Sequence, residues 1–141
     1  MVRWIVLLAG ILGAAAVAIG AFAAHGMEEF LAKQSLAPEE IAKRLSQCEV
    51  GVRYHLWHTL AILTLGMTAY PSSSGQKSQN HRRRAAATIC LVLGITLFSG
   101  GLYSMSIFGV MGHWAIVPSG GATLILGWLV IASMALINDR N

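Results

Sequence analysis

An uncharged run of 21 residues, Trp4 to Ala24, follows a single arginine at the start of this chain. A helix needs roughly 20 apolar residues to cross the hydrocarbon of a bilayer, so the run is long enough to span a membrane. Ala21-Phe22-Ala23 also resembles the cleavage site of a secretory signal, but the run exceeds the apolar core of about 7 to 15 residues that such signals carry. We therefore expect a retained first helix that spans the membrane over residues 4–24.

The composition predicts the same class for the whole chain. Of its 141 residues, 55% are hydrophobic and only 11% are charged, with a mean hydropathy of +0.62. This balance leaves too little polar surface to cover a soluble globule. We predict one all-α domain over residues 1–141, an integral membrane four-helix bundle in the cell (inner) membrane, with membrane lipids as its surroundings. The expected spans are residues 4–24, 51–70, 85–106 and 118–137.

The second expected span, Gly51 to Tyr70, begins with unusually polar residues. Arg53, His55 and His58 all lie inside it. At about 1.5 Å of rise per residue, His58 lies roughly 10 Å below the membrane surface. Polar groups at such depth normally face protein or water rather than lipid, whereas Arg53 can extend its charged end outward along its aliphatic stem.

Histidines gather toward one end of the expected bundle, where His25 ends the first span and His113 lies in the connection after the third. We therefore define a candidate polar cluster. Its members are His25, Arg53, Tyr54, His55 and His58. Neutral imidazoles bind zinc, copper or iron, but their spacing here matches no strong metal motif. Hydrogen bonds between helices, a proton relay and contact with a solute are the alternatives, and we assign no metal and no cofactor.

The polar region 27–50 separates the first two spans. Proline in a first turn and acids beside the positive end of a helix dipole favour a helix start at Ser35 to Glu40. Ile41, Leu45 and Cys48 then recur at helical spacing. We expect an amphipathic helix that lies at the membrane surface, continues into the second span, and either packs on the bundle or binds a partner.

Small residues mark places where helices can approach closely. In the first span they recur every four positions in two ridges, and in the fourth they follow a proline. The ridges are Ala16, Gly20 and Ala24, and Gly10, Ala14 and Ala18. Either ridge could pack within the chain or form a dimer interface. Pro118, Gly120 and Gly121 fit a helix start packed tightly on a neighbour, or a broken helix that exposes carbonyls to a substrate.

Basic residues predict the orientation. Six of them fall on one side of a four-span arrangement, Arg3, Lys77, Arg82, Arg83, Arg84 and Arg140. Excess Lys and Arg in short flanks marks the cytoplasmic side, so we expect residues 71–84 to form a basic cytoplasmic loop and both termini to be cytoplasmic. A basic loop beside a span follows from topology alone, and we therefore expect no nucleic-acid partner.

The sequence lacks the common catalytic and phosphate-binding motifs. The sequence has no phosphate-binding glycine loop, no serine nucleophile motif and no HExxH. No aspartate or glutamate lies within an expected span, which argues against a proton antiporter that uses carboxylates. Cys48 and Cys90 are expected at opposite ends of the bundle as free thiols. We do not predict an enzyme.

Several segments nevertheless carry a family resemblance. They are GAFAAHGM at 20–27, Tyr54 and His58 leading into an apolar helix, LFSGGLY at 97–103, and PSGGATLILGW at 118–128. In this order they resemble the YwdK/YgdD-like family of small membrane proteins, over nearly the whole chain. The resemblance implies a four-helix membrane protein and brings no activity, substrate or cofactor with it. It favours attention to His25, His58, Pro118, Gly120 and Gly121, whereas His55 and His113 do not match family positions and Ala23 replaces a usual glycine.

Two functions remain open from the sequence. The first is a structural or accessory membrane component that packs against itself as a homo-oligomer, or against a larger membrane complex. The second is a binder or transporter of a small solute or metal that uses the candidate polar cluster as an outward-facing site. A pocket lined by that cluster would separate the second from the first.

Overall fold

The computed structural model of the protein describes residues 2–68, 77–110 and 112–135. In these residues the chain forms five helices and no strand, so the predicted all-α class is confirmed there. The helices are α1 (Val2–His25), α2 (Met27–Ala32), α3 (Pro38–Met67), α4 (Lys77–Phe108) and α5 (Ile116–Ala135).

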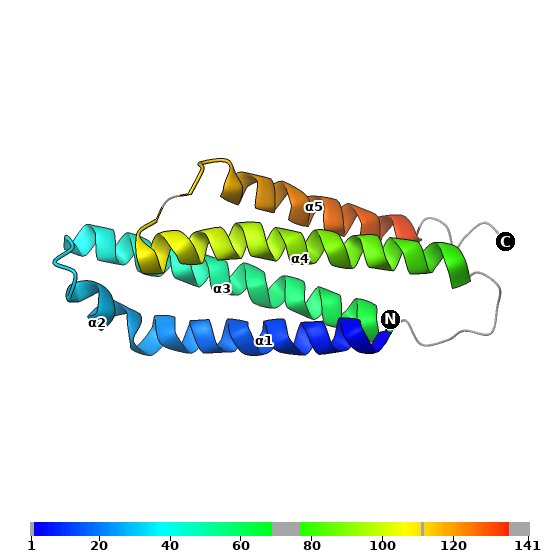
Figure 1. Ribbon diagram of the computed structural model, residues 1–141, viewed down its shortest axis with the longest axis horizontal. Coiled ribbons are helices and arrows are strands. Elements are labelled where there is room, and N and C mark those ends of the chain that lie inside the picture. The colour runs from blue at the N-terminus through cyan, green and yellow to red at the C-terminus, as the bar shows by residue number, and fades with distance from the viewer. Residues whose placement is uncertain (1, 69–76, 111, 136–141) are drawn as a thin grey trace.

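The four long helices lie side by side in the order α1, α3, α4, α5, each antiparallel to its neighbour (Figure 1). The main contacts join α1 to α3, α3 to α4 and α4 to α5. Because each helix follows its neighbour after a short connection, this serial order is the simplest packing available to the chain. It places α3 and α4 in the middle and α1 and α5 at the two edges.

Three of the long helices are long and apolar enough to cross a membrane, over Arg3–His25, His81–Phe108 and Ile116–Ala135. They correspond to the first, third and fourth expected spans. The expected end of the fourth span at Ile137 lies outside the described residues, as does Arg140. In α3, Arg53, His55 and His58 make the stretch that begins at Gly51 less apolar. The end of that expected span, at Tyr70, also lies outside the described residues.

The region 27–50 is helical over α2 and over the first turns of α3. As predicted, a helix begins at Pro38, with Glu39 and Glu40 in its first turn. As expected, it continues into the second expected span and runs without interruption to Met67, so residues 38–50 are the first turns of α3. Cys48 is packed in a small core with residues of α2 and partly buried Leu45 and Ile41. An apolar stripe that meets its partner within the chain has no need to lie along the membrane surface.

The expected loop over residues 71–84 was also too long. Residues 77–84 are the first turns of α4, whereas residues 71–76 lie outside the described residues. No glycine or proline occurs between Lys77 and Gly94, and the polar and basic residues at the start of α4 are compatible with a helix. The charged residues before Ala85 therefore belong to the helix, which begins eight residues earlier than the expected span.

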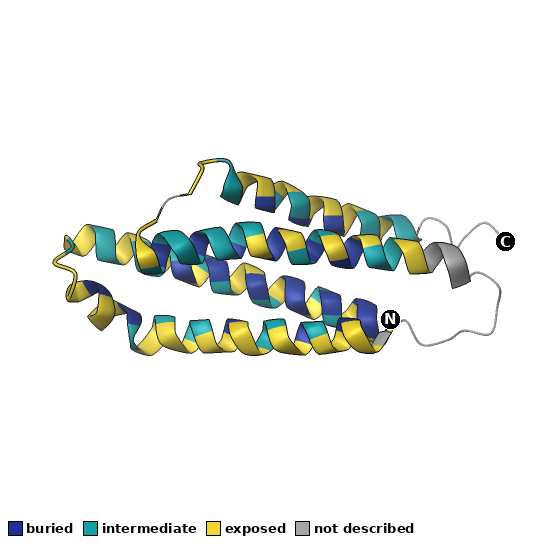
Figure 2. Cartoon of the chain, viewed as in Figure 1, coloured by how far each residue is buried: buried dark blue, intermediate teal, exposed yellow. Residues whose placement is uncertain are grey.

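Burial follows the position of each helix in the row (Figure 2). The main core lies between the middle helices and their neighbours and includes Ile62, Leu91 and Leu124. The edge helix α1 leaves Leu7, 52% exposed, and Val17, 63% exposed, on its outer face. Apolar side chains exposed along a spanning helix face lipid in a membrane protein.

Candidate functional site

The predicted polar cluster is divided between exposed and buried positions. His25 ends α1 and is exposed, as is Arg53 on α3. Tyr54 is 42% exposed, whereas His55 and His58 are 5% and 7% exposed. Two of the five residues therefore face the protein interior.

The register of α1 on α3 keeps His25 apart from the other histidines. A Cβ added to Gly20 would lie 3.2 Å from Val52, and one added to Gly13 would lie 3.7 Å from Thr59. In this antiparallel pair His25 is level with about residue 47, so His55 lies about 12 Å further along the axis at 1.5 Å per residue. Among the described residues, no group of three or more His, Cys, Asp and Glu side chains could hold a metal ion.

His55 joins the two middle helices. Its Nδ1 lies 3.2 Å from the hydroxyl oxygen of Tyr103 on α4. Tyr103 also lies against the backbone of α3, since a Cβ added to Gly51 would be 2.8 Å from its ring. The glycine therefore brings α4 close enough for the tyrosine to reach the imidazole one turn away.

His58 joins α3 to α5 through aromatic contacts. Its Nδ1 pairs with the carbonyl oxygen of Tyr54, which fixes the ring orientation. The imidazole stacks on the ring of Tyr54 at a centroid distance of 5.7 Å and meets the edge of Trp128 at 6.1 Å. Tyr54 in turn contacts Phe98 of α4 at 4.6 Å. His58 therefore occupies a packing position where three helices meet.

The predicted helix-packing motif contains one position with no room for a side chain. A Cβ added to Gly120 would lie 2.8 Å from the carbonyl carbon of Leu97, whereas one added to Gly121 would be 3.6 Å from Phe98. Pro118 lies in the first turn of α5, where a backbone donor has no partner within the helix. This arrangement is a continuous helix packed on α4 rather than a broken one.

Partly buried arginines form a feature that the sequence reasoning missed. Arg83 donates from Nη1 to the carbonyl oxygen of Ser133 at 2.7 Å, near the end of α5. Arg84 donates from Nη1 to the carbonyl oxygen of Leu65 at 3.2 Å and to Oγ1 of Thr68 at 2.9 Å, at the end of α3. Each guanidinium thus meets the negative end of a helix dipole. Helical spacing places Arg83 and Arg84 on different sides of α4, and this spacing was the signal in the sequence that the two arginines contact different helices.

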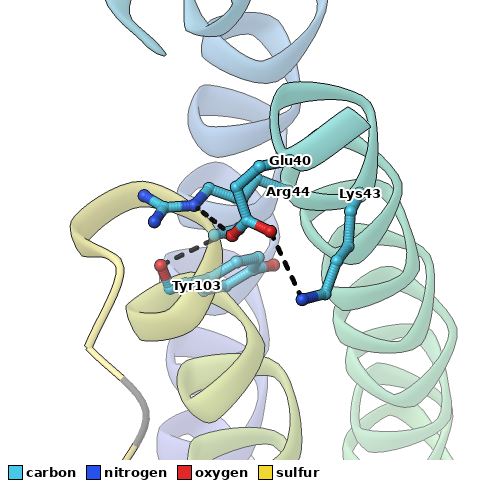
Figure 3. Close-up of polar contacts among 5 residues, drawn as sticks. Glu40, Lys43, Arg44 and Tyr103 are labelled. Carbon is cyan, nitrogen blue, oxygen red and sulfur yellow. Dashed lines mark hydrogen bonds and ion pairs between the residues drawn. The ribbon is translucent and has the colours of Figure 1, made fainter. Parts of the chain in front are cut away.

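A third arginine, Arg44, also lies near the end of another helix, at the opposite end of the molecule. Arg44 donates from Nε to Glu40 at 3.0 Å, and Lys43 lies on the other side of that carboxylate at 3.4 Å (Figure 3). The hydrogen bond from Arg44 lowers the pKa of the Glu40 carboxyl. The guanidinium also lies against Gly109, which follows the last residue of α4 with a φ of 67°. Glycine adopts this left-handed conformation readily at the end of a helix.

A cavity of about 210 Å³ opens at the same end of the molecule, between α4, α5 and their connection. Its lining is mostly apolar and contains none of the five residues of the candidate polar cluster. The lining includes Leu102, Met105, His113, Trp114, Ile116 and Val117.

Several known proteins are similar to this chain over most of its length. A family model described as protein of unknown function (DUF423) matches residues 19–121. The chain is 34% identical over 116 residues to a UPF0382 membrane protein of Haemophilus influenzae, which covers 82% of this chain and 80% of that protein. It is 31% identical over 131 residues to the UPF0382 membrane protein YwdK of Bacillus subtilis, covering 93% and 94%. It is 30% identical over 135 residues to the UPF0382 inner membrane protein YgdD of Escherichia coli K12, covering 92% and 86%. No solved structure matches the chain significantly.

Proposed function

The chain belongs to the DUF423 family, whose relatives bear the names of membrane proteins, and from that premise we propose a four-span structural or accessory component of the membrane. In this proposal its helices pack against those of a second copy or of a larger membrane complex. The predicted resemblance to YwdK and YgdD is confirmed by these relatives.

The position of α3 supports the fourth span. Residues 51–67 lie between α1 and α4, with Val52 and Thr59 against glycines of α1 and Gly51 against Tyr103 of α4. Both flanking helices are long and apolar enough to cross a membrane. A helix held between two spanning helices over the same length crosses with them. His55 and His58 are buried in protein, so their polarity does not oppose insertion.

Charge supports an orientation with both termini in the cytoplasm. The described residues at the end that holds Arg82, Arg83 and Arg84 include no acid, whereas the opposite end carries all five glutamates. Lys and Arg near the ends of spans determine orientation, and acids contribute little. The α2 end of the molecule is therefore the outer end in this proposal.

The observation that carries the accessory role is the free ridge of α1. Ala16 is fully buried and Gly20 lies close to Val52 of α3, so the first ridge packs within the chain at these two positions, whereas Ala24 is exposed. Gly10, Ala14 and Ala18 are exposed, and nothing lies within 4 Å of a Cβ added to Gly10. A ridge of small residues lets another helix backbone approach closely in a membrane, where packing rather than hydrophobicity drives association.

Ala14→Leu tests this role, with Ala15→Leu as the matched control because both alanines are exposed at the same depth. We expect the gently extracted protein to form an assembly larger than one protomer. Ala14→Leu should shift it to the protomer, whereas Ala15→Leu should leave its mass unchanged. Native mass spectrometry of all three proteins measures this. A protomer carrying only lipid in the unmodified protein, or an assembly that tolerates Ala14→Leu, would contradict the role.

A further inference from the structure

The contact between α3 and α4, which we call the middle seam, has a register fixed at Gly51. A Cβ added to Gly51 would lie 3.4 Å from Cβ of Leu102 and 2.8 Å from the ring of Tyr103. The two helices run antiparallel, so one turn further along α3 corresponds to one turn back along α4. Residues 55 and 99 are therefore level with each other, on the same faces that meet at Gly51 and Tyr103.

Polar atoms without partners are buried at this level. Nε2 of His55, Oγ of Ser99 and Oγ1 of Thr59 are inaccessible and have no hydrogen-bond partner within the described part of the protein. The three side chains are 5%, 0% and 4% exposed. Thr59 lies one turn beyond His55 on α3, but its methyl group faces Gly13 of α1, so it belongs to the contact between α3 and α1. His55 and Ser99 therefore border the same stretch of the middle seam.

Neither tautomer of His55 removes the need of Nε2 for a hydrogen-bond partner. If the hydroxyl of Tyr103 donates to Nδ1, Nε2 carries a hydrogen that needs an acceptor. If Nδ1 donates to Tyr103, Nε2 is a lone pair that needs a donor. Lipid supplies neither, and an unsatisfied polar group in such surroundings is costly. A group buried this deeply in a native fold is normally satisfied by protein or by ordered water.

We propose that the middle seam contains a binding site for ordered water, where one water molecule or a small cluster bridges His55 Nε2 and Ser99 Oγ. Water fits because it donates and accepts, which meets a hydroxyl and either imidazole tautomer. The site has one imidazole and no carboxylate or thiolate among these groups, so its chemistry favours a neutral ligand over a metal cation.

Apolar side chains lie next to this water site along the two middle helices. Ile62 of α3 and Ile95 of α4 are at most 4% exposed and offer water no partners. Thr88 of α4 has another buried hydroxyl without a partner among the described residues, but it lies 11 residues from Ser99, about 16 Å along the helix. The proposed water is therefore held locally beside His55 and Ser99.

Hydroxyl-radical footprinting by pulsed X-ray radiolysis tests the site, because buried water produces radicals beside the residues that it contacts. His58 is a matched internal control, since it lies on the same helix at nearly the same burial but its Nδ1 already pairs with Tyr54. We expect His55 to be oxidised several-fold faster than His58 in the folded protein. Ser99→Ala should lower the His55 rate to about that of His58. Thr96→Val is the control variant, because the Thr96 hydroxyl is exposed and bonds within α4.

Two results would overturn the water site. Equal oxidation rates of His55 and His58 in the unmodified protein would show that no water lies beside His55. A His55 rate that Ser99→Ala leaves unchanged would remove Ser99 from the site. Should Ser99→Ala fail to fold, Ser99→Cys carries the same expectation, because a thiol is similar in shape to the hydroxyl but a much weaker hydrogen-bond partner. Folding of each variant is checked by circular dichroism and gel filtration.

Discussion

At Gly120 a single added carbon would meet backbone rather than a side chain that can move. The nearest atoms belong to the main chain of Leu97 and Phe98 on α4. Neighbouring Gly121 has only an ordinary contact with the ring of Phe98. The two glycines are equivalent in the sequence motif, yet only the first sets the distance between α4 and α5.

Gly120→Ala should therefore lower the free energy of unfolding by about 1–3 kcal/mol, because the added methyl group forces the two helices apart. Gly121→Ala should not lower the free energy of unfolding, and should raise it by up to about 1 kcal/mol because alanine has the better helix propensity. Unfolding of both variants in mild detergent, followed by circular dichroism, measures the difference. Equal stability of the two variants would mean that α5 does not pack on α4 through Gly120.

The sequence predicted which residues of the candidate site are buried better than it predicted which residues lie close together. It indicated that His55 and His58 face protein, and both are buried. It also grouped them with His25, because all three lie toward one end of the chain's expected spans. Grouping by depth failed because it depends on the register between helices, which glycines such as Gly20 and Gly51 set through contacts distant in sequence.

At the scale of whole helices, the two arginines of α4 stabilise the ends of its neighbours. Arg84 meets the last turn of α3, and Arg83 meets the last turn of α5. The last carbonyls of a helix have no partner within it, so a guanidinium there satisfies a polar group and opposes the dipole. Arg82, next in the chain, is exposed.

Arg84→Gln should lower the free energy of unfolding by about 1–2 kcal/mol, since it removes a charged donor from a partly buried helix end. Arg82→Gln removes the same charge from an exposed position and should stay within about 0.5 kcal/mol of the unmodified protein. Denaturant unfolding at fixed ionic strength compares the two. If both variants lose the same stability, the effect is one of net charge and the contact at the end of α3 contributes nothing.

The start of α3 was more predictable than the start of α4. Pro38 with two glutamates identified the start of α3, because these residues act locally on the first turn. The helical spacing from Ile41 to Cys48 also predicted that this helix continues into the second span. The start of α4 at Lys77, before its apolar part, was not predicted. Apolar periodicity locates the part of a helix inside a membrane and says little about how far the helix extends beyond it.

At the scale of the whole molecule, the central helix α3 combines a polar first half with two buried histidines, which interrupt its apolar residues. Its neighbours on both sides are apolar enough to span. Hydropathy read along one segment cannot register that His55 and His58 are shielded by other helices. The serial arrangement of the four helices supplies that shielding, and a four-span topology follows from it as our central proposal.

Accessibility of single cysteines to a membrane-impermeant maleimide tests this topology most directly. Lys33→Cys, Ser72→Cys and His113→Cys, each in a Cys48→Ser, Cys90→Ser background, report on the three connections between the proposed spans. We predict labelling of Lys33→Cys and His113→Cys in intact cells, and labelling of Ser72→Cys only after permeabilisation. If Lys33→Cys and Ser72→Cys are labelled from the same side, α3 does not cross the membrane and the four-span proposal is wrong.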